Sequence, residues 1–111
     1  MPTSKYHARK TVVDGITFDS RREAKRYGEL KLLERAGVIR DLKRQVRYEL
    51  IPAFDVGVKH YRPTSYVADF VYTDCKTGAE VVEDCKGFRT DIYRLKSKMF
   101  AHKFGVVILE T

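Results

Sequence analysis

The pattern of apolar and polar positions divides the chain into short strands and two helices. Residues 12–18 (VVDGITF) place β-forming residues on both sides of an Asp-Gly dipeptide, which is typical of a tight hairpin turn. The next stretch carries apolar side chains at helical spacing and stops before Gly37, a residue that commonly ends helices. The pattern predicts an N-terminal β-hairpin and then a first helix from about Ser20 to Ala36.

Three strands are predicted after this helix. Residues 46–51 (VRYELI) alternate between apolar and polar side chains, and residues 66–73 (YVADFVYT) are mostly β-branched or aromatic. Residues 79–86 follow the second strand after a turn at 74–78, so these two strands are expected to form a hairpin. Residues 53–65 are expected to be a loop with some extended backbone.

A second helix and a last strand complete the prediction. The helix should run from residue 90 or 91 to about residue 103, with one apolar face made of Ile92, Leu95, Met99 and Phe100. Residues 106–110 (VVILE) are almost wholly apolar, as expected for a strand buried on both faces. The order α-β-β-β-α-β after the hairpin predicts an α/β fold with a mixed sheet flanked by helices.

Length and composition are consistent with this fold. The chain has 111 residues, of which 43% are hydrophobic and 12% aromatic, enough to build a core. We expect one domain, with residues 1–18 as an N-terminal arm and hairpin and residues 19–111 as the core. No apolar run is long enough to span a membrane, and the N-terminus lacks the apolar segment of a signal peptide, so we expect a cytoplasmic protein.

The cysteines and histidines do not predict a zinc site. Cys75 and Cys85 are too few for a disulfide scaffold or a four-cysteine site. His7, His60 and His102 lack the short spacing of paired zinc ligands. We interpret both cysteines as reduced, small apolar residues.

Charge is unevenly distributed. The formal net charge is +7; residues 1–50 carry 13 basic and 7 acidic side chains, and residues 51–111 carry 9 and 8. A basic half beside a nearly balanced half suits a polyanion that must approach an acidic centre. A basic surface also serves solubility, so charge alone leaves a nucleic-acid partner open.

The acidic centre is suggested by the stretch VVEDCKG. Because strand side chains alternate between faces, Asp84 and Lys86 should point the same way and Glu83 the other way. Asp69 interrupts the preceding strand and should lie near Asp84 across the hairpin. Two close carboxylates repel unless one is protonated or a cation lies between them, and Mg²⁺ prefers oxygen ligands. The alternatives are a surface position for Asp69 and a solvent-facing pair of Asp84 with Lys86.

A third acid, Glu23, lies in the first turn of the first helix. Ser20 and Glu23 have the spacing of a capping box, in which the glutamate serves only to satisfy a backbone N–H. Arg21 and Arg22 occupy a helix N-terminus, where the helix dipole disfavours cations. They therefore fit better as phosphate contacts.

These residues resemble the PD-(D/E)XK nuclease superfamily, which has the restriction-endonuclease-like fold with an αβββαβ core. Its site combines an acid on the first helix, an Asp on the second core strand and a (D/E)-x-K motif on the third. The stretches KYHARKTVVDGITFDSRREAKRY, LKRQVRYELIP, YVADF, VEDCKG and YRLKSKMF are similar to a family of small, mostly phage and prophage proteins of this superfamily. The chain also resembles a transposase endonuclease subunit in its helical Glu, its Q-x-x-x-x-L strand and its D-F motif.

The resemblance implies a Mg²⁺-dependent DNA endonuclease of phage type, with Mn²⁺ as a substitute metal. The implied catalytic residues are Glu23, Asp69, Asp84 and Lys86. The implied metal ligands are Asp69, Asp84, the main-chain carbonyl of Cys85, and Glu23. Lys86 would orient the attacking water and neutralise developing charge. The pathway would be recombination, packaging or junction processing.

Two features depart from the superfamily's pattern or leave it ambiguous. Ala68 replaces the Pro of the signature, although that Pro is not a ligand. Glu83 stands beside Asp84, and strand alternation with Lys86 selects Asp84 as the ligand.

Several cations and tyrosines are candidate DNA contacts. Phosphate-binding side chains are expected at Arg21, Arg22, Lys25, Arg89, Arg94, Lys96 and Lys98, and in the N-terminal arm at Lys5, Arg9 and Lys10. Lys96 would reach toward the site. Tyr6, Tyr61 and Tyr66 could stack on unpaired bases, although tyrosines more often belong to a core.

The short chain leaves no room for a separate specificity domain. Recognition should therefore depend on DNA structure, such as a junction, or on a partner protein of the phage. Double-strand cleavage would require a homodimer, and a monomer would nick. The alternatives are a catalytically inactive nuclease fold that binds DNA as a regulatory subunit, and a nuclease directed at RNA.

Overall fold

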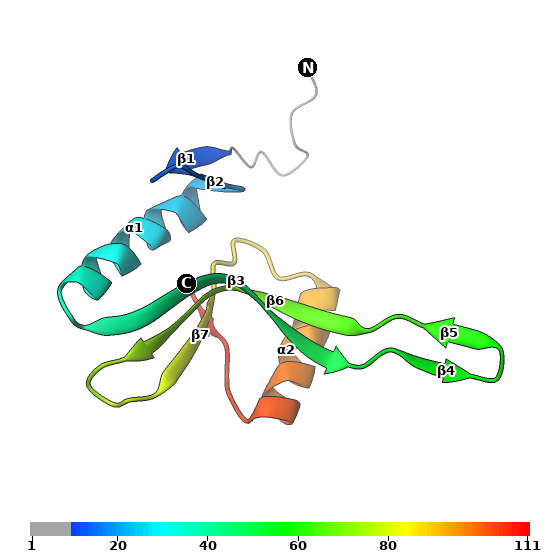
Figure 1. Ribbon diagram of the computed structural model, residues 1–111. Helices are drawn as coiled ribbons and strands as arrows, with labels where there is room; N and C mark the ends of the chain where they lie inside the picture. The colour runs from blue at the N-terminus through cyan, green and yellow to red at the C-terminus, as the bar shows by residue number, and fades with distance from the viewer. Residues whose placement is uncertain (1–9) are drawn as a thin grey trace, which may run out of the picture.

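The computed structural model describes residues 10–111 (Figure 1). These residues form a mixed α/β fold with a mixed sheet, two flanking helices and an antiparallel N-terminal hairpin, as predicted. The elements are β1 Thr11–Val13, β2 Ile16–Phe18, α1 Arg21–Arg35, β3 Ile39–Ile51, β4 Phe54–Val56, β5 Lys59–Tyr61, β6 Thr64–Asp74, β7 Glu80–Asp84, α2 Asp91–Phe104 and β8 Leu109–Glu110.

The main sheet of the described residues has the strand order β3-β6-β7-β8. The β3–β6 and β6–β7 pairs are antiparallel, and β8 adds parallel to β7. A parallel neighbour requires a crossover, and α2 provides it. The predicted hairpin of the second and third core strands is therefore present as β6 and β7.

The N-terminal hairpin and α1 begin and end as predicted. Asp14 and Gly15 both have positive φ, 51° and 75°, as a type I′ turn requires. The Ser20 hydroxyl oxygen accepts a hydrogen bond from the Glu23 N–H, and α1 is capped at Ala36. The local turn and capping chemistry thus determines the first hairpin and the N-terminus of α1.

The strand β3 is longer than predicted. It begins at Ile39, whereas the alternating pattern indicated only residues 46–51. Residues 40–45 are mainly charged, and Asp41 has a left-handed backbone within an irregular stretch of the ladder. These residues pair with β6 through their backbones, and a strand with one side facing solvent needs no continuous apolar pattern.

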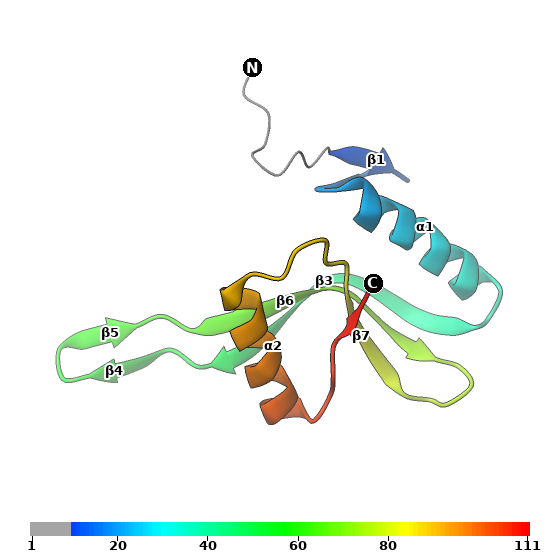
Figure 2. The same ribbon diagram turned by 180° about the vertical axis from the view of Figure 1, so that it is seen from behind.

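Residues 53–65, expected to be a loop with some extended backbone, are more regular than predicted. The strands β4 and β5 form a ribbon that projects from the body of the molecule (Figures 1 and 2). The pairs Ile51↔Thr64 and Phe54↔Tyr61 belong to one continuing register, which places Pro52 opposite Pro63. Because proline has no N–H to donate, the ladder stops at this point and resumes beyond it.

The core of the described residues has two parts. The α1 core comprises the buried residues Phe18, Ala24, Tyr27, Leu30, Ile39, Phe70 and Tyr72. The α2 core comprises the buried residues Leu50, Tyr66, Ala68, Val71, Val82, Tyr93, Phe100 and Ile108. The strand β6 contributes to both, so it joins the two helices into one structure.

Two predictions for the C-terminal part were wrong in detail. On the predicted apolar face of α2, Phe100 is buried and Met99 packs against the α2 core, but Ile92 is 68% exposed and Leu95 is also exposed. Tyr93, which was not on the predicted face, is buried. The last strand is shorter than residues 106–110, and Val107 is 85% exposed. Both errors arose because the packed face of a short element depends on its partner as well as on hydrophobicity.

Candidate active site

The strands β6 and β7 bring two carboxylates together. The ladder pairs Phe70 with Glu83, and the next positions along the two strands are Asp69 and Asp84. The Asp69 Oδ2 atom accepts a hydrogen bond of 2.9 Å from the Cys85 N–H, which fixes this side chain against the end of β7. The juxtaposition expected from the sequence is therefore present.

Asp84 is an almost fully buried acid, with 1% of its surface exposed. The Tyr66 hydroxyl donates a 2.5 Å hydrogen bond to its Oδ2 atom. Its Oδ1 atom lies 3.2 Å from Lys86 Nζ, an ion-pair distance, yet accepts no hydrogen bond from any residue between 10 and 111. A buried carboxylate oxygen without a hydrogen-bond donor is costly.

Lys86 is held between the acid and an aromatic ring. It follows the end of β7, and its Nζ atom lies 4.4 Å from the ring centroid of Tyr93 on α2. The Tyr93 hydroxyl donates to Glu110 at 2.8 Å, which orients the ring. The Lys86 side chain remains 28% exposed, so its charge faces both Asp84 and solvent.

Asp69 carries a strongly perturbed carboxyl group. Burial raises the pKa of Asp69 to about 7, and hydrogen bonding and charge repulsion from Asp84 act in the same direction. The Cys85 N–H opposes this pKa rise by stabilising the charged form. At neutral pH this pair of acids therefore favours a proton or a cation between them.

Glu23 is tied to the same region through the neighbouring strand. Its carboxylate lies 3.6 Å from the Arg44 guanidinium and accepts a 3.2 Å hydrogen bond from the Gln45 amide. The same Gln45 amide donates to Asp69 Oδ1 at 3.3 Å. Burial raises the pKa of Glu23, while the charge of Arg44 lowers it.

The capping interpretation accounts for only half of these contacts. Ser20 caps α1 by accepting from the Glu23 N–H, but the Glu23 carboxylate contacts β3. Sequence reasoning did not single out Gln45 as a site residue. Its only signal was a polar amide within the Q-x-x-x-x-L strand pattern.

Glu83, the neighbour of Asp84, lies in a different environment. Its fully buried carboxylate accepts from Arg26 Nε at 2.7 Å and Nη2 at 2.9 Å, and from the Tyr72 hydroxyl at 2.8 Å. Thr111 adds a longer contact of 3.3 Å. Glu83 is thus saturated by partners beside the α1 core, whereas Asp84 is not.

The donor set can be compared with the needs of a metal ion. Within residues 10–111, no group of three or more His, Cys, Asp or Glu side chains is arranged to hold one. Two carboxylates remain, Asp69 and Asp84, with the main-chain carbonyl of Cys85 between Asp84 and Lys86. Oxygen donors of this kind, including the Asp84 Oδ1 atom that makes no hydrogen bond, fit Mg²⁺, which keeps several of its waters.

The predicted DNA contacts lie in several places. Exposed cations of the expected set are Arg21, Arg22 and Lys25 on α1, and Arg94 and Lys98 on α2. Arg89 forms an ion pair with Glu110 at 2.5 Å. Lys96 is half-buried, and the lysine that forms the ion pair with Asp84 is Lys86. Lys10 is exposed, and Lys5, Tyr6 and Arg9 lie outside the described residues.

One of the candidate stacking residues is excluded from that role. Tyr66 is 3% exposed and serves as the hydrogen-bond donor to Asp84. Tyr61 stacks on Phe54 in the β4–β5 ribbon, with ring centroids 4.8 Å apart. Tyr66 and Tyr61 are therefore both engaged in contacts within the protein.

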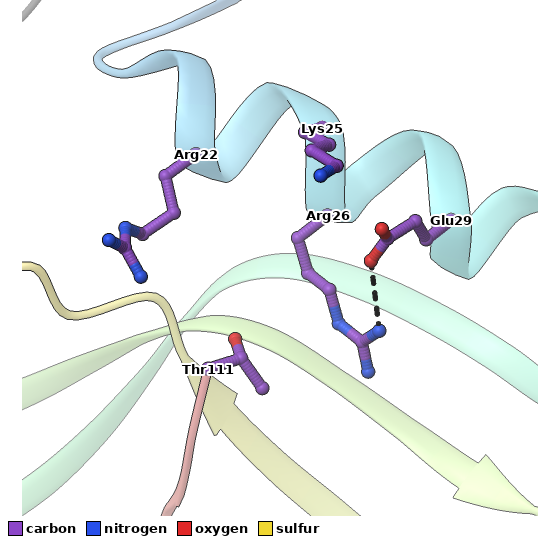
Figure 3. Close-up of a pocket in the computed structure, with 5 residues that line it drawn as sticks. All are labelled: Arg22, Lys25, Arg26, Glu29 and Thr111. Carbon is purple, nitrogen blue, oxygen red and sulfur yellow. Dashed lines mark hydrogen bonds and ion pairs between the residues drawn. The ribbon is translucent and has the colours of Figure 1, made fainter.

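A pocket lies beside this site, between α1 and the end of the chain (Figure 3). It has a volume of about 410 Å³ and is lined by Arg22, Lys25, Arg26, Glu29 and Thr111. Neither Asp69 nor Asp84 lines it. The pocket adjoins the site through the backbone, because the Lys86 N–H donates to the Thr111 carbonyl at 3.2 Å.

The cysteines take no part in disulfides. Cys75 is exposed, and Cys85 is half-buried with its thiol 3.4 Å from the Thr111 hydroxyl. Burial raises the pKa of the Cys85 thiol to about 11, so it is protonated at neutral pH.

No helix among residues 10–111 is long and apolar enough to cross a membrane.

Comparison with known proteins gives one family. No curated protein and no solved structure matches the chain. A family described as "Protein of unknown function (DUF1064)" matches residues 3–110, and the chain belongs to this family.

Proposed function

We propose that the protein is a Mg²⁺-dependent DNA endonuclease of the PD-(D/E)XK type. The observation that carries the proposal is the buried Asp84, whose Oδ1 atom makes no hydrogen bond and is contacted by the Lys86 ammonium group at an ion-pair distance, with Asp69 beside it. A purely structural acid is expected to be saturated, as Glu83 is. A buried carboxylate oxygen without a hydrogen bond, beside a second carboxylate, is suited to a hard cation.

The ligands would be Asp69, Asp84 and the carbonyl of Cys85. A bound Mg²⁺ polarises a phosphodiester and lowers the pKa of a coordinated water. The protein supplies the fixed geometry: Tyr66 holds one oxygen of Asp84, and the Cys85 N–H holds one oxygen of Asp69. The other two carboxylate oxygens, Asp69 Oδ1 beside the Gln45 amide and Asp84 Oδ1 beside Lys86, would face the ion.

Lys86 would act on the reacting phosphate. Its ammonium group has Asp84 on one side and the Tyr93 ring on another, and it is partly exposed. From this position it can donate hydrogen bonds to an attacking water or to a phosphate oxygen. A compact, mobile cation is suited to charge that develops during phosphodiester hydrolysis.

DNA is the substrate that the charge distribution favours. The chain has a net charge of +7, and the exposed cations of α1 lie on the helix that carries Glu23. Such side chains bind phosphates without reading bases, so we propose selection by DNA structure or by a phage partner protein. Cleavage of both strands would require a homodimer.

The test is a cleavage panel. Duplex, single-stranded, flap, fork and four-way-junction DNA, with matched RNA, are incubated with Mg²⁺, Mn²⁺ or EDTA. Asp84→Asn and Lys86→Ala should each lower cleavage by at least about a hundredfold, because each removes a group that acts in the transition state. DNA binding should remain within about threefold of wild type.

Matched controls come from the same part of the fold. Glu80→Gln changes an exposed acid at the other end of β7, and Lys76→Ala changes an exposed lysine in the β6–β7 turn; both should cleave like wild type. Metal-independent cleavage, or full activity in Asp84→Asn, contradicts the proposal. Binding to every substrate without cleavage would favour the regulatory DNA-binding alternative, and preference for RNA would reassign the substrate.

A further inference from the structure

Gln45 has a backbone conformation that its residue type does not favour. Its φ is 52°, in the left-handed region, which is uncommon for residues other than Gly, Asn and Asp. Asp14 and Asp41 are the other non-glycine residues with positive φ among residues 10–111. Both are aspartates, whose short polar side chains tolerate this region, so Gln45 is the exception.

The β3–β6 register continues unchanged past this point, but one pair is missing from the ladder. The strand β3 pairs Arg44 with Phe70 and Val46 with Ala68, but Gln45 and Asp69, which lie between these pairs, are not paired. Gln45 is also exposed, so burial of its side chain does not explain the strained backbone. Strain of this kind persists where the surrounding structure imposes it, and it gathers at functional sites.

The same point divides the two cores. On β6, Tyr66 and Ala68 belong to the α2 core, whereas Phe70 and Tyr72 belong to the α1 core. The even-numbered side chains of β6 therefore pack into the α2 core before Asp69 and into the α1 core after it. Asp69 lies opposite Gln45, the residue with the left-handed backbone. The irregularity turns Gln45 toward the carboxylates of two different elements.

We propose that Gln45 is a positioning residue that joins Glu23 on α1 to Asp69 on β6, so that Glu23 acts on the site through this amide and is not a direct metal ligand. The inference rests on the proposed function. The amide donates to both acids, at 3.2 Å and 3.3 Å. The Glu23 carboxylate also lies 3.6 Å from the Arg44 guanidinium, so it has an ion-pair partner as well as the Gln45 amide.

If Glu23 were a direct ligand, its carboxylate would have to leave both Arg44 and Gln45. Held as it is, Glu23 orients the Gln45 amide, and the amide orients Asp69 Oδ1. Groups that orient metal ligands typically change affinity or activity by about 10- to 100-fold when they are removed.

The experiment compares Gln45→Gly with Asp41→Gly. Both variants relieve a left-handed backbone in β3, so both should have a melting temperature at or above wild type. Gln45→Gly should lower kcat for DNA cleavage by about 10- to 100-fold with little change in KM, and Asp41→Gly should leave both unchanged. A purely structural residue would not combine retained stability with lost turnover.

Mn²⁺ binding to the metal-site variants tests the second part. Asp69→Asn removes a ligand and should weaken Mn²⁺ binding by more than about tenfold. Glu23→Gln keeps an oxygen that can accept from the Gln45 amide, so its Mn²⁺ binding should stay within about threefold of wild type. If Glu23→Gln weakens Mn²⁺ binding as strongly as Asp69→Asn, Glu23 is a ligand and the inference is wrong. If Gln45→Gly cleaves like Asp41→Gly, the positioning role is wrong while the nuclease stands; absence of cleavage by wild type instead removes the proposed function.

Discussion

At the scale of single residues, the adjacent acids Glu83 and Asp84 lie in different environments on the two faces of one strand. Glu83 is saturated by a bidentate arginine and a tyrosine, and Asp84 retains an oxygen without a donor. Their side chains leave the strand on opposite sides, as strand alternation predicts. One acid thus stabilises the fold, and the other remains available to a ligand.

The carboxyl group of Asp69 predicts a pH-dependent stability. Its pKa is about 7 in the folded chain, against an ordinary value of 3.8. A raised acid pKa contributes stability that is complete below about pH 4 and is lost as the pH rises through 7. The metal-free wild type should therefore lose more thermal stability between about pH 4 and pH 7 than Asp69→Asn does.

The measurement is a series of melting curves in EDTA, in which the difference between wild type and Asp69→Asn isolates this group. Glu80→Gln serves as the exposed control and should follow wild type. Adding Mg²⁺ near pH 7.5 should raise the melting temperature of wild type more than that of Asp69→Asn. Parallel curves for wild type and Asp69→Asn would mean that this carboxyl group is not perturbed.

The sequence predicted these residues unequally. Alternation placed Asp84 with Lys86, and the hairpin turn placed Asp69 opposite them. The bridging role of Gln45 could not be predicted, because it depends on one left-handed residue in a strand, and the sequence has no Gly or Asn there. The role of Tyr66 could not be predicted either, because a tyrosine in the sequence can be a buried hydrogen-bond donor or an exposed stacking ring.

At the scale of elements, a buried ion pair connects α1 to the strand β7. Arg26 binds Glu83 across 57 positions of sequence, and Glu83 is fully buried while Arg26 is 24% exposed. Arg26→Ala would leave a buried carboxylate without its cation, which costs about 3 kcal/mol of unfolding free energy. Urea denaturation should show this loss.

A control on the same helix is Lys31→Ala, which removes an exposed pair with Glu34. Its denaturation midpoint should match wild type, because exposed pairs contribute little. Equal midpoints for the two variants would show that the α1–sheet connection depends on apolar packing alone.

Elements with strong local signals were predicted well, and elements defined by pairing were not. The caps of α1 and the turn of the first hairpin are chemical features of a few neighbouring residues. The β4–β5 ribbon has no core behind it; its strands form because the register of β3 and β6 continues past two prolines. Long-range register of this kind is not visible in a local pattern.

At the scale of the whole molecule, the excess positive charge predicts salt-dependent DNA binding. We expect the affinity of the Asp84→Asn protein for DNA to fall steeply with salt. Replacing Arg21, Arg22 and Lys25 together with Gln should reduce the magnitude of the log–log slope by about 2 to 3, because each cation that contacts a phosphate releases a counterion.

The matched control removes the same charge elsewhere. The control replaces three exposed cations with Gln: Lys59, Arg62 and Lys76. They belong to the ribbon region and the β6–β7 turn, far along the chain from α1. This variant should retain nearly the wild-type slope. Equal slopes for both triple variants would mean that DNA is attracted by net charge without a defined contact surface on α1.

The sheet has an outer strand, β3, whose 13 residues leave one backbone edge unpaired in the described structure. Long free edges can template the addition of strands from other chains, and proteins oppose this with charged side chains and local kinks. This edge carries Arg40, Lys43 and Arg47, and its backbone is broken by left-handed residues at Asp41 and Gln45. We therefore expect the irregular backbone that brings Gln45 to the carboxylates also to oppose aggregation through this edge.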